Sequence, residues 1–192
     1  PKTIALTFDD GPVPSTTKIL DLLKELQIPA TFFVLGDESE KRPELLKRIQ
    51  TEGHMLGNHT YNHPHYIGLR SKNVILSQIA KTNTIVEHAV GERPTIFRSP
   101  FGESTLYSDS IAKHLGMTPF LWTMTTVDWN KHTTADVLNK KLSAINQSEI
   151  VLMHDRVYAD DAKFAVLKRN LIRLQKEGYT FITLRDLDSA GH

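Results

Sequence analysis

The sequence predicts an α/β fold around a parallel β-sheet, either open or closed into a barrel. Three observations indicate this fold. Short apolar runs alternate with amphipathic stretches along the whole chain, about seven of the first kind and about six of the second. Capping residues, proline and glycine mark the boundaries between them. The 192 residues suffice for one sizeable core, and no linker, repeat or low-complexity segment divides them, so we expect a single domain over residues 1–192.

The expected strands and helices follow one another in order. Strands are expected at residues 3–8, 30–36, 54–58, 95–100, 119–124, 149–154 and 179–184. Helices are expected at residues 15–27, 42–53, 71–91, 108–116, 134–145 and 163–178. Expected helix starts are Ser15, Pro43, Ser108 and Thr134, and expected stops are Gly53, Gly91, Gly116 and Gly178. In the first helix, Ile19, Leu22, Leu23 and Leu26 have the i, i+3, i+4, i+7 spacing of a buried face.

The composition limits the classes of ligand and partner. Hydrophobic residues make up 40% and charged residues 23%, as in ordinary globular proteins. The formal net charge is +1 with scattered Lys and Arg, which argues against nucleic acid or an anionic membrane as the partner. No apolar run approaches the length of a membrane span. Cysteine is absent, so any metal must be bound by His, Asp or Glu.

Residues able to do chemistry follow nearly every expected strand, whereas the loops at the opposite strand ends carry mostly turn residues. In parallel α/β folds, sites form on the loops that follow the strands. The residues in question are Asp9, Asp10, His59, His63, His65, Arg98, Asp128, Trp129, His154 and Asp155. This one-sided placement predicts an active site at the carboxyl ends of the strands.

The strongest local indication is the pair His59 and His63. Four residues apart, two imidazoles would share one face of a helical turn and could bind one metal ion; the alternative is a polar loop that carries histidines. Two histidines and a carboxylate leave coordination positions open for water and substrate, as in catalytic zinc sites. One of the adjacent residues Asp9 and Asp10 would then bind the cation and the other accept a proton, unless they form an Asp-rich turn before Gly11.

Short stretches in chain order resemble the motifs of the NodB-homology polysaccharide deacetylases, carbohydrate esterase family 4. They are TFDDGP, HTYNHP, RSPFG, VDW and LMHD, and the similarity continues to the closing KEGYTFITLRDL. The resemblance implies a distorted (β/α) barrel with about seven parallel strands, which agrees with the number of apolar runs. It also implies roles for individual residues.

By this resemblance, Asp10, His59 and His63 would hold one divalent metal ion. Zinc is expected from the His and Asp ligands, with Co²⁺, Ni²⁺ or Mn²⁺ as alternatives. Asp9 would be the general base for attack of water on an N-acetyl carbonyl. His154 would be the general acid that protonates the departing amine, since imidazole titrates near neutral pH.

The resemblance implies supporting roles as well. Arg98 would orient Asp9 and keep it ionised, and Asp128 would either steady Arg98 or raise the basicity of His154. Three residues are expected to contact substrate: Phe101 through a nearby backbone N–H that binds the oxyanion, Leu152 in the pocket for the acetyl methyl, and Trp129 by stacking on a sugar unless it is core.

Two positions depart from the family pattern. Thr125 stands where the family usually has an aspartate, three residues before Asp128, so a carboxylate next to the site is missing. Phe101 replaces the more usual tyrosine and lacks its hydroxyl. Neither departure removes a residue expected to bind metal or transfer a proton.

The loops around the site are expected at residues 37–41, 61–71 and 154–164. In the last of these, Arg156 and Tyr158 are candidate sugar contacts. Six further histidines remain without an assigned role, with His88 and His114 expected at the surface and His65 and His132 on loops that could reach substrate: His54, His65, His88, His114, His132 and His192.

The expected function is metal-dependent hydrolysis of N-acetyl groups from N-acetylglucosamine-containing polysaccharide, with release of acetate. Peptidoglycan, chitin or its oligosaccharides, and poly-N-acetylglucosamine are the substrates considered. Alternatives are an O-acetyl xylan esterase with the same site, hydrolysis of a small amide, and a non-catalytic polysaccharide-binding module. We expect a monomer without membrane contact that acts extracellularly or at the cell wall; the location rests on the family alone.

Overall fold

The computed structural model describes residues 1–65, 67–103 and 106–190, and its tertiary contacts divide the chain into two compact units. The first unit comprises Pro1–Asp9, Val13–Thr31 and Trp122–His192, and the second comprises Asp10–Pro12 and Phe32–Leu121. The peptide bond between Asp9 and Asp10 is therefore one of the places where the chain passes from one unit to the other. His192 lies outside the described residues.

The first unit is built on a parallel sheet with β1 (Thr3–Asp9) in its middle. β1 pairs with β7 (Glu149–His154) on one side and with β8 (Thr180–Ile182) on the other, and β6 (Met124–Thr125) pairs with β7. All of β1 after Thr3 is buried, as expected for a strand covered on both faces. The register pairs Asp9 with His154, so the two ends of these strands place their side chains on the same face of the sheet.

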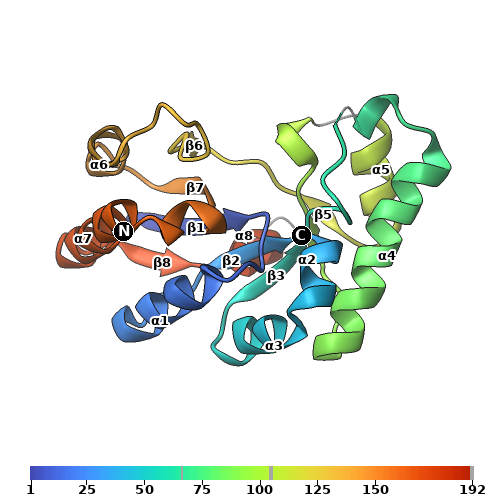
Figure 1. Cartoon of the computed structure of the whole chain (residues 1–192), viewed down its shortest axis with the longest axis horizontal. Coiled ribbons are helices and arrows are strands. Elements are labelled where there is room, and N and C mark those ends of the chain that lie inside the picture. Colours follow the sequence, from blue (N-terminus) through green and yellow to red (C-terminus); the bar gives the residue numbers. More distant parts are fainter. Residues whose placement is uncertain (66, 104–105, 191–192) are drawn as a thin grey trace. The chain divides into compact units, whose positions relative to one another are not determined.

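Helices cover this sheet. They are α1 (Thr16–Leu26), α6 (Ala135–Ser143), α7 (Asp161–Lys176) and α8 (Leu184–Ala190), with a 3₁₀ helix, η3, at Asp155–Ala159. α1 buries Ile19, Leu22 and Leu23 as the spacing predicts, while Leu26 is half-buried. α6 and α7 lie side by side, as Figure 1 shows, and the Arg173 guanidinium of α7 donates to the Leu142 carbonyl of α6.

The second unit contains the strand order β5-β4-β3-β2. These strands are short: β2 (Thr31–Val34), β3 (Met55–Asn58), β4 (Ile96–Phe97) and β5 (Thr118–Pro119). Gly57 is required in β3, because a Cβ there would lie 2.5 Å from the ring of Phe33. The strand thereby lets a large aromatic ring pack directly against its backbone.

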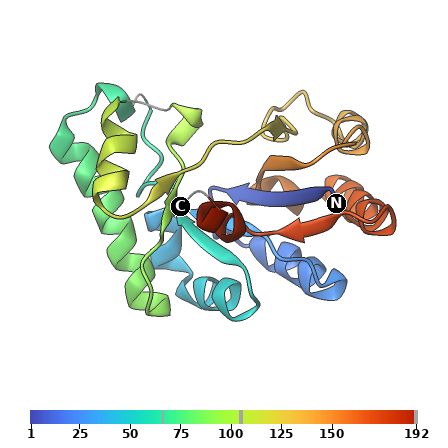
Figure 2. The same ribbon diagram turned by 180° about the vertical axis from the view of Figure 1, so that it is seen from behind.

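The described residues of this unit also form α-helices and 3₁₀ helices. They are α2 (Gly36–Lys41), α3 (Pro43–Thr51), α4 (Lys72–Val90), α5 (Leu106–His114), η1 (Ile67–Leu69) and η2 (Pro100–Gly102). α4 begins where Ser71 accepts the Val74 N–H and ends at Gly91, whose φ of 81° suits glycine. α4 and α5 pack against each other, which is visible from behind in Figure 2.

Three sequence expectations about elements are wrong. Residues 119–124 form parts of β5 and β6 rather than one strand, because the Arg98 guanidinium takes the carbonyls of Phe120 and Leu121. Residues 37–41 belong to helix α2 rather than a loop, with Glu38 paired to Lys41 and Arg42 one turn on. α5 begins at Leu106 and not at Ser108, and α8 was not expected. Within the described ranges, no helix is long and apolar enough to span a membrane.

Candidate active site

Three side chains that could hold a metal ion converge in the second unit. The Oδ1 atom of Asp10 lies 3.3 Å from Nε2 of His59 and 3.4 Å from Nε2 of His63. One potential ligand atom from each residue lies within 4.8 Å of the other two. His59 is buried, whereas Asp10 and His63 are partly exposed, so the group is reachable from solvent.

The spacing of these atoms fits a tetrahedral metal ion. Two ligand atoms at about 2.05 Å from one centre are about 3.4 Å apart at the tetrahedral angle, which matches both Asp10–His separations. The Nδ1 atom of His59 lies 2.6 Å from the Arg98 carbonyl oxygen. Because a carbonyl only accepts, Nδ1 carries the proton and the Nε2 lone pair faces the group. The residues present therefore fit a divalent cation.

The backbone that carries His59 and His63 is irregular. The expectation that the two share a helical turn is wrong, since residues 59–65 form no helix. Instead, Thr60 and His63 take left-handed φ values of 76° and 59°, which turn both imidazoles toward Asp10. The buried Asn58 side chain fixes this turn by accepting the Thr60 N–H at 2.9 Å and donating to the Ile79 carbonyl of α4.

Aromatic contacts surround the outer histidine. The Phe101 ring lies edge-on to His63, with 4.5 Å between centroids, and stacks on His65 at 4.3 Å. Phe101 is 50% exposed and has a φ of 59°. The phenylalanine that replaces the usual tyrosine therefore lies against His63, a candidate metal ligand. His65, expected on a loop that could reach substrate, completes this ring cluster.

A second cluster of predicted site residues lies in the first unit, after the carboxyl ends of β1, β6 and β7. Nδ1 of His154 and Oδ1 of Asp128 are 2.8 Å apart, a hydrogen-bond distance. The backbone N–H of His154 donates to Oδ2 of the same carboxylate at 2.9 Å. Of the two roles expected for Asp128, this geometry supports the one at His154. Asp9, the partner of His154 in the β1–β7 register, is 3% exposed.

Tyr158 belongs to the same hydrogen-bonded group. Its hydroxyl donates to Oδ2 of Asp128 at 3.1 Å, and the residue has no exposed surface. The expectation that Tyr158 contacts sugar is therefore wrong, whereas Arg156 in the same loop is exposed. Burial and the neighbouring Asp128 charge raise the pKa of the Tyr158 phenol well above its usual value, so it stays a hydrogen-bond donor.

The segment after His154 is tied to the start of α1. The buried Asp155 carboxylate accepts the Thr16 hydroxyl at 2.6 Å, and the Asp155 carbonyl accepts the Ser15 hydroxyl at 2.8 Å. Thr16 in turn accepts the Val13 N–H at 2.9 Å. This chain of hydrogen bonds holds the loop after the Asp9–Asp10 pair, and the sequence showed no sign of it.

Arg98 is fully buried in the second unit. Its guanidinium donates to the carbonyls of Phe120 at 3.1 Å and Leu121 at 2.6 Å. The same group lies 4.3 Å from the centroid of the Phe33 ring. These contacts hold the guanidinium in one orientation, and its own carbonyl oxygen orients His59.

Two residues expected to contact substrate, Trp129 and Leu152, differ in exposure, and Thr125, which departs from the family pattern, has a structural role. Trp129 is 54% exposed, so the alternative that it belongs to the core is wrong. Leu152 is buried on β7. The Thr125 hydroxyl accepts the Val127 N–H at 3.0 Å, and Val127 has a φ of 51°. Thr125 thus caps the turn that leads into Asp128.

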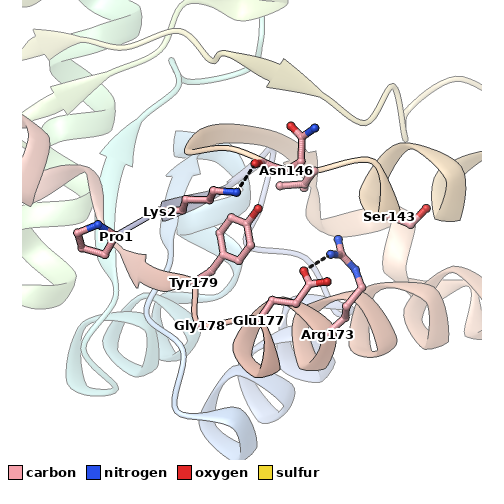
Figure 3. A pocket seen from close by; sticks show the side chains of 9 residues that line it. Pro1, Lys2, Ser143, Asn146, Arg173, Glu177, Gly178 and Tyr179 are labelled. Atoms are coloured by element: carbon pink, nitrogen blue, oxygen red, sulfur yellow. Dashed lines mark hydrogen bonds and ion pairs between the residues drawn. The ribbon is translucent and has the colours of Figure 1, made fainter.

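A cavity elsewhere in the first unit is unrelated to these residues. It measures about 570 Å³ and is lined by Pro1 and Lys2 before β1, by the end of α6 and the residues that follow it, and by Arg173 of α7 and residues 177–179 after that helix, as Figure 3 shows. Its cations already have partners, since Lys2 donates to the Asn146 carbonyl at 2.7 Å and Arg173 pairs with Glu177 at 2.5 Å. Asp9 ends the same strand roughly 20 Å away at about 3.3 Å per residue.

Comparison with known proteins identifies the family of this chain. The polysaccharide deacetylase family model matches residues 1–120. The chain is 38% identical over 187 residues to the peptidoglycan-N-acetylglucosamine deacetylase PgdA of Listeria monocytogenes, an alignment that covers 97% of this chain and 39% of that relative. This chain therefore spans well under half of that protein's length.

Solved structures show the same fold. The peptidoglycan deacetylase PdaC of Bacillus subtilis matches with a TM-score of 0.84 and 35% identity, over 98% of this chain and 90% of that one. BA3943 of Bacillus anthracis, described as a family 4 carbohydrate esterase pseudoenzyme, matches with a TM-score of 0.85 and 29% identity, over 97% of this chain and 65% of that one. The predicted α/β fold is confirmed. With the family model covering more than half of its residues, the chain belongs to the polysaccharide deacetylase family.

Proposed function

We propose that this chain is a metal-dependent deacetylase that hydrolyses N-acetyl groups of N-acetylglucosamine-containing polysaccharide and releases acetate. Peptidoglycan is the expected polymer, as the name of the Listeria relative suggests. The fold alone does not support an activity, because the pseudoenzyme shares it. The observation that carries the proposal is the convergence of Asp10, His59 and His63 at the separations of tetrahedral metal ligands.

We assign Asp10, His59 and His63 as the ligands of one divalent cation, with zinc as the expected ion. When bound, such a cation polarises an amide carbonyl and stabilises the negative charge that develops on its oxygen. The chain's own contribution is orientation. The hydrogen bond from His59 Nδ1 to the Arg98 carbonyl fixes the tautomer, and Asn58 holds the turn that aims both rings.

Asp9 and His154 are proposed as the residues that move protons. Asp9 would accept a proton from the attacking water, and His154 would donate one to the departing amine. Because the Asp128 carboxylate lies at Nδ1 of His154, the other ring nitrogen, Nε2, is the one left to exchange a proton. Asp128 also favours the imidazolium form, which is the form that acts as an acid.

Supporting roles are proposed for four more residues. Arg98 would keep Asp9 ionised, and its fixed guanidinium suits this role. A backbone N–H at Phe101 would bind the developing oxyanion, and Leu152 would contact the acetyl methyl. The exposed Trp129 indole would stack on a sugar ring. We also propose that residues 1–192 act as one catalytic domain and a monomer, outside the cytoplasm, where the wall polymer lies.

Acetate release tests the proposal. Chelated protein is assayed on N-acetylglucosamine oligomers of increasing length, on N-acetylated peptidoglycan and on O-acetylated xylan, before and after addition of zinc. Release that requires zinc and increases with oligomer length supports a glycan deacetylase. Release from xylan alone would mean that the same residues hydrolyse an O-acetyl ester instead of an N-acetyl group.

A matched variant separates catalysis from binding. Asp9→Asn keeps the shape of the side chain but cannot accept the proton, so acetate release should fall at least 100-fold while affinity for the oligomer persists. If zinc-loaded wild type binds oligomers and releases no acetate from any acetylated glycan, the chain is a binding module.

A further inference from the structure

We propose that Tyr158 is a positioning residue for His154, acting through Asp128. The proposal deepens the function above, since it concerns the residue assigned as the general acid. The sequence suggested a different role for Tyr158, and its position is set by contacts within the first unit.

The Asp128 carboxylate accepts three hydrogen bonds, one on Oδ1 and two on Oδ2. Oδ1 faces Nδ1 of His154 at 2.8 Å. Oδ2 accepts hydrogen bonds from the backbone N–H of His154 at 2.9 Å and from the Tyr158 hydroxyl at 3.1 Å. With two donors on Oδ2, the carboxylate is held against rotation, and Oδ1 remains directed at the imidazole. The side chain of Asp128 has no exposed surface, so water does not replace these donors.

Tyr158 is itself held firmly. It lies on η3, in the segment that directly follows His154, and it is fully buried. Its ring meets Phe8 edge-to-face, with 6.2 Å between centroids and an angle of 82°. Phe8 precedes Asp9 on β1. The hydroxyl is thus placed by packing against the strand that carries the proposed base, and it cannot leave Asp128 without opening the core.

The phenol also adjusts the charge that His154 experiences. A hydrogen bond to a carboxylate stabilises its negative charge and weakens its attraction for a nearby proton. Tyr158 therefore moderates the effect of Asp128 on His154. Among the described residues of this unit, the ionisable groups near His154 include Asp128, which contacts it, Tyr158 beyond Asp128, its register partner Asp9 and the next residue, Asp155.

The test replaces only the hydroxyl, with the variant Tyr158→Phe. The titration midpoint of the His154 ring is followed by NMR in the zinc-loaded protein, after assignment with His154→Gln. Removing the phenol leaves more charge on Oδ1 of Asp128, so the midpoint should rise by about 0.5 to 1 pH unit. Turnover should fall about 3- to 10-fold with little change in KM, and the basic limb of the pH–rate profile should move up with the midpoint.

Two variants calibrate the result. Tyr179→Phe removes a hydroxyl at the other end of the sheet, beside the cavity of Figure 3, and should leave the midpoint unchanged. Asp128→Asn removes the charge itself and should lower the midpoint, the opposite direction. A thermal melt confirms that Tyr158→Phe is folded.

An unchanged or lowered His154 midpoint in folded Tyr158→Phe would overturn the proposal, as would an equal rise in Tyr179→Phe. The outcome is independent of the proposed function because the titration needs no turnover. A rise in a protein that releases no acetate keeps the positioning role and rejects the deacetylase. If the protein releases acetate and the His154 midpoint does not move in Tyr158→Phe, the deacetylase function is kept and the positioning role is rejected.

Discussion

Two carboxylate–imidazole groups in this molecule differ in the distance between their atoms and in the ring nitrogen that they use. In the second unit, Oδ1 of Asp10 is 3.3 Å from Nε2 of His59 and 3.4 Å from Nε2 of His63. In the first unit, Oδ1 of Asp128 is 2.8 Å from Nδ1 of His154. The shorter distance is that of a hydrogen bond, and the two longer distances fit side chains that surround a common cation.

The two groups also stand on different kinds of backbone. Left-handed φ values of 78°, 76° and 59° at Asp10, Thr60 and His63 shape the metal-binding group, and such conformations cost energy in residues other than glycine. His154 ends a regular strand whose register with β1 is continuous. The comparison shows that the candidate metal group rests on an irregular turn that Asn58 holds, whereas the Asp128–His154 pair stands at the end of a regular strand.

The largest expected effect on activity comes from replacing Asp10, a proposed metal ligand. Asp10→Asn replaces the charged ligand by a neutral amide of the same shape, so zinc content should fall and kcat/KM should drop by at least about 1,000-fold. Metal analysis after dialysis and acetate release measure both. Asp136→Asn, on the exposed start of α6, is the matched control and should change neither. Retention of one zinc per chain in Asp10→Asn would contradict the assignment of this ligand.

The second effect concerns the hydrogen-bonded group. Asp128→Asn presents an amide to His154, which removes the charge and disfavours the tautomer with the proton on Nδ1. We expect kcat to fall about 100-fold or more while bound zinc is unchanged. Parallel assays of turnover and zinc content separate the two groups. Loss of zinc in Asp128→Asn would show that the groups are not independent.

The sequence predicted the parts of this site that depend on regular strands. β1 and β7 were expected at 3–8 and 149–154 and are found at Thr3–Asp9 and Glu149–His154, because continuous apolar runs identify buried strands well. An aspartate of the Asp9–Asp10 pair could be grouped with His59 and His63 because strand ends meet at one edge of a parallel sheet, and the family resemblance selected Asp10.

What the sequence could not predict depends on side-chain contacts between distant residues. Tyr158 looks like a loop residue until packing against Phe8 shows it to be buried. The break between β5 and β6 arises because a distant guanidinium takes the carbonyls of residues 120 and 121. The turn at His59 and His63 rests on Asn58, whose partner lies on α4. None of these contacts leaves a periodic pattern in the sequence.

A further histidine, His54, is buried outside both groups and should make the free energy of unfolding depend on pH. His54 is 5% exposed and packs edge-on to the Phe32 ring at 5.6 Å. Burial lowers the pKa of His54 to about 4, from 6.5; the Glu52 charge raises this pKa by less, and the Arg48 charge lowers it further. The folded state thus favours neutral His54, so its contribution is complete above pH 6.5 and is lost as the pH falls toward 4.

The expected loss over this interval is roughly 2 to 3 kcal/mol of unfolding free energy, because one pKa unit corresponds to about 1.4 kcal/mol. Urea unfolding at pH 7, 5.5 and 4.5 measures it. His54→Phe keeps a ring against Phe32 and should reduce the pH dependence, whereas the exposed His88→Phe should not. Equal slopes for wild type and His54→Phe would contradict the assignment.

The smallest effect concerns Thr125, where the family usually has an aspartate. The Thr125 hydroxyl accepts the Val127 N–H at 3.0 Å, as an aspartate carboxylate at the same place could. Val127 needs this support, since a φ of 51° is unfavourable for a β-branched residue, and Asp128 comes next in the chain. The hydroxyl therefore replaces the carboxylate in building the turn rather than in carrying charge.

Thr125→Ala removes the acceptor and should lower the unfolding free energy by about 0.5 to 1 kcal/mol and turnover about 2- to 5-fold. Thr125→Asp restores an acceptor and should stay within about 2-fold of wild type on both measures. Denaturant unfolding and acetate release distinguish the two variants. A large gain in turnover for Thr125→Asp would mean that charge at this position matters, and that the threonine weakens the hydrogen-bonded group at Asp128 rather than merely supporting its turn.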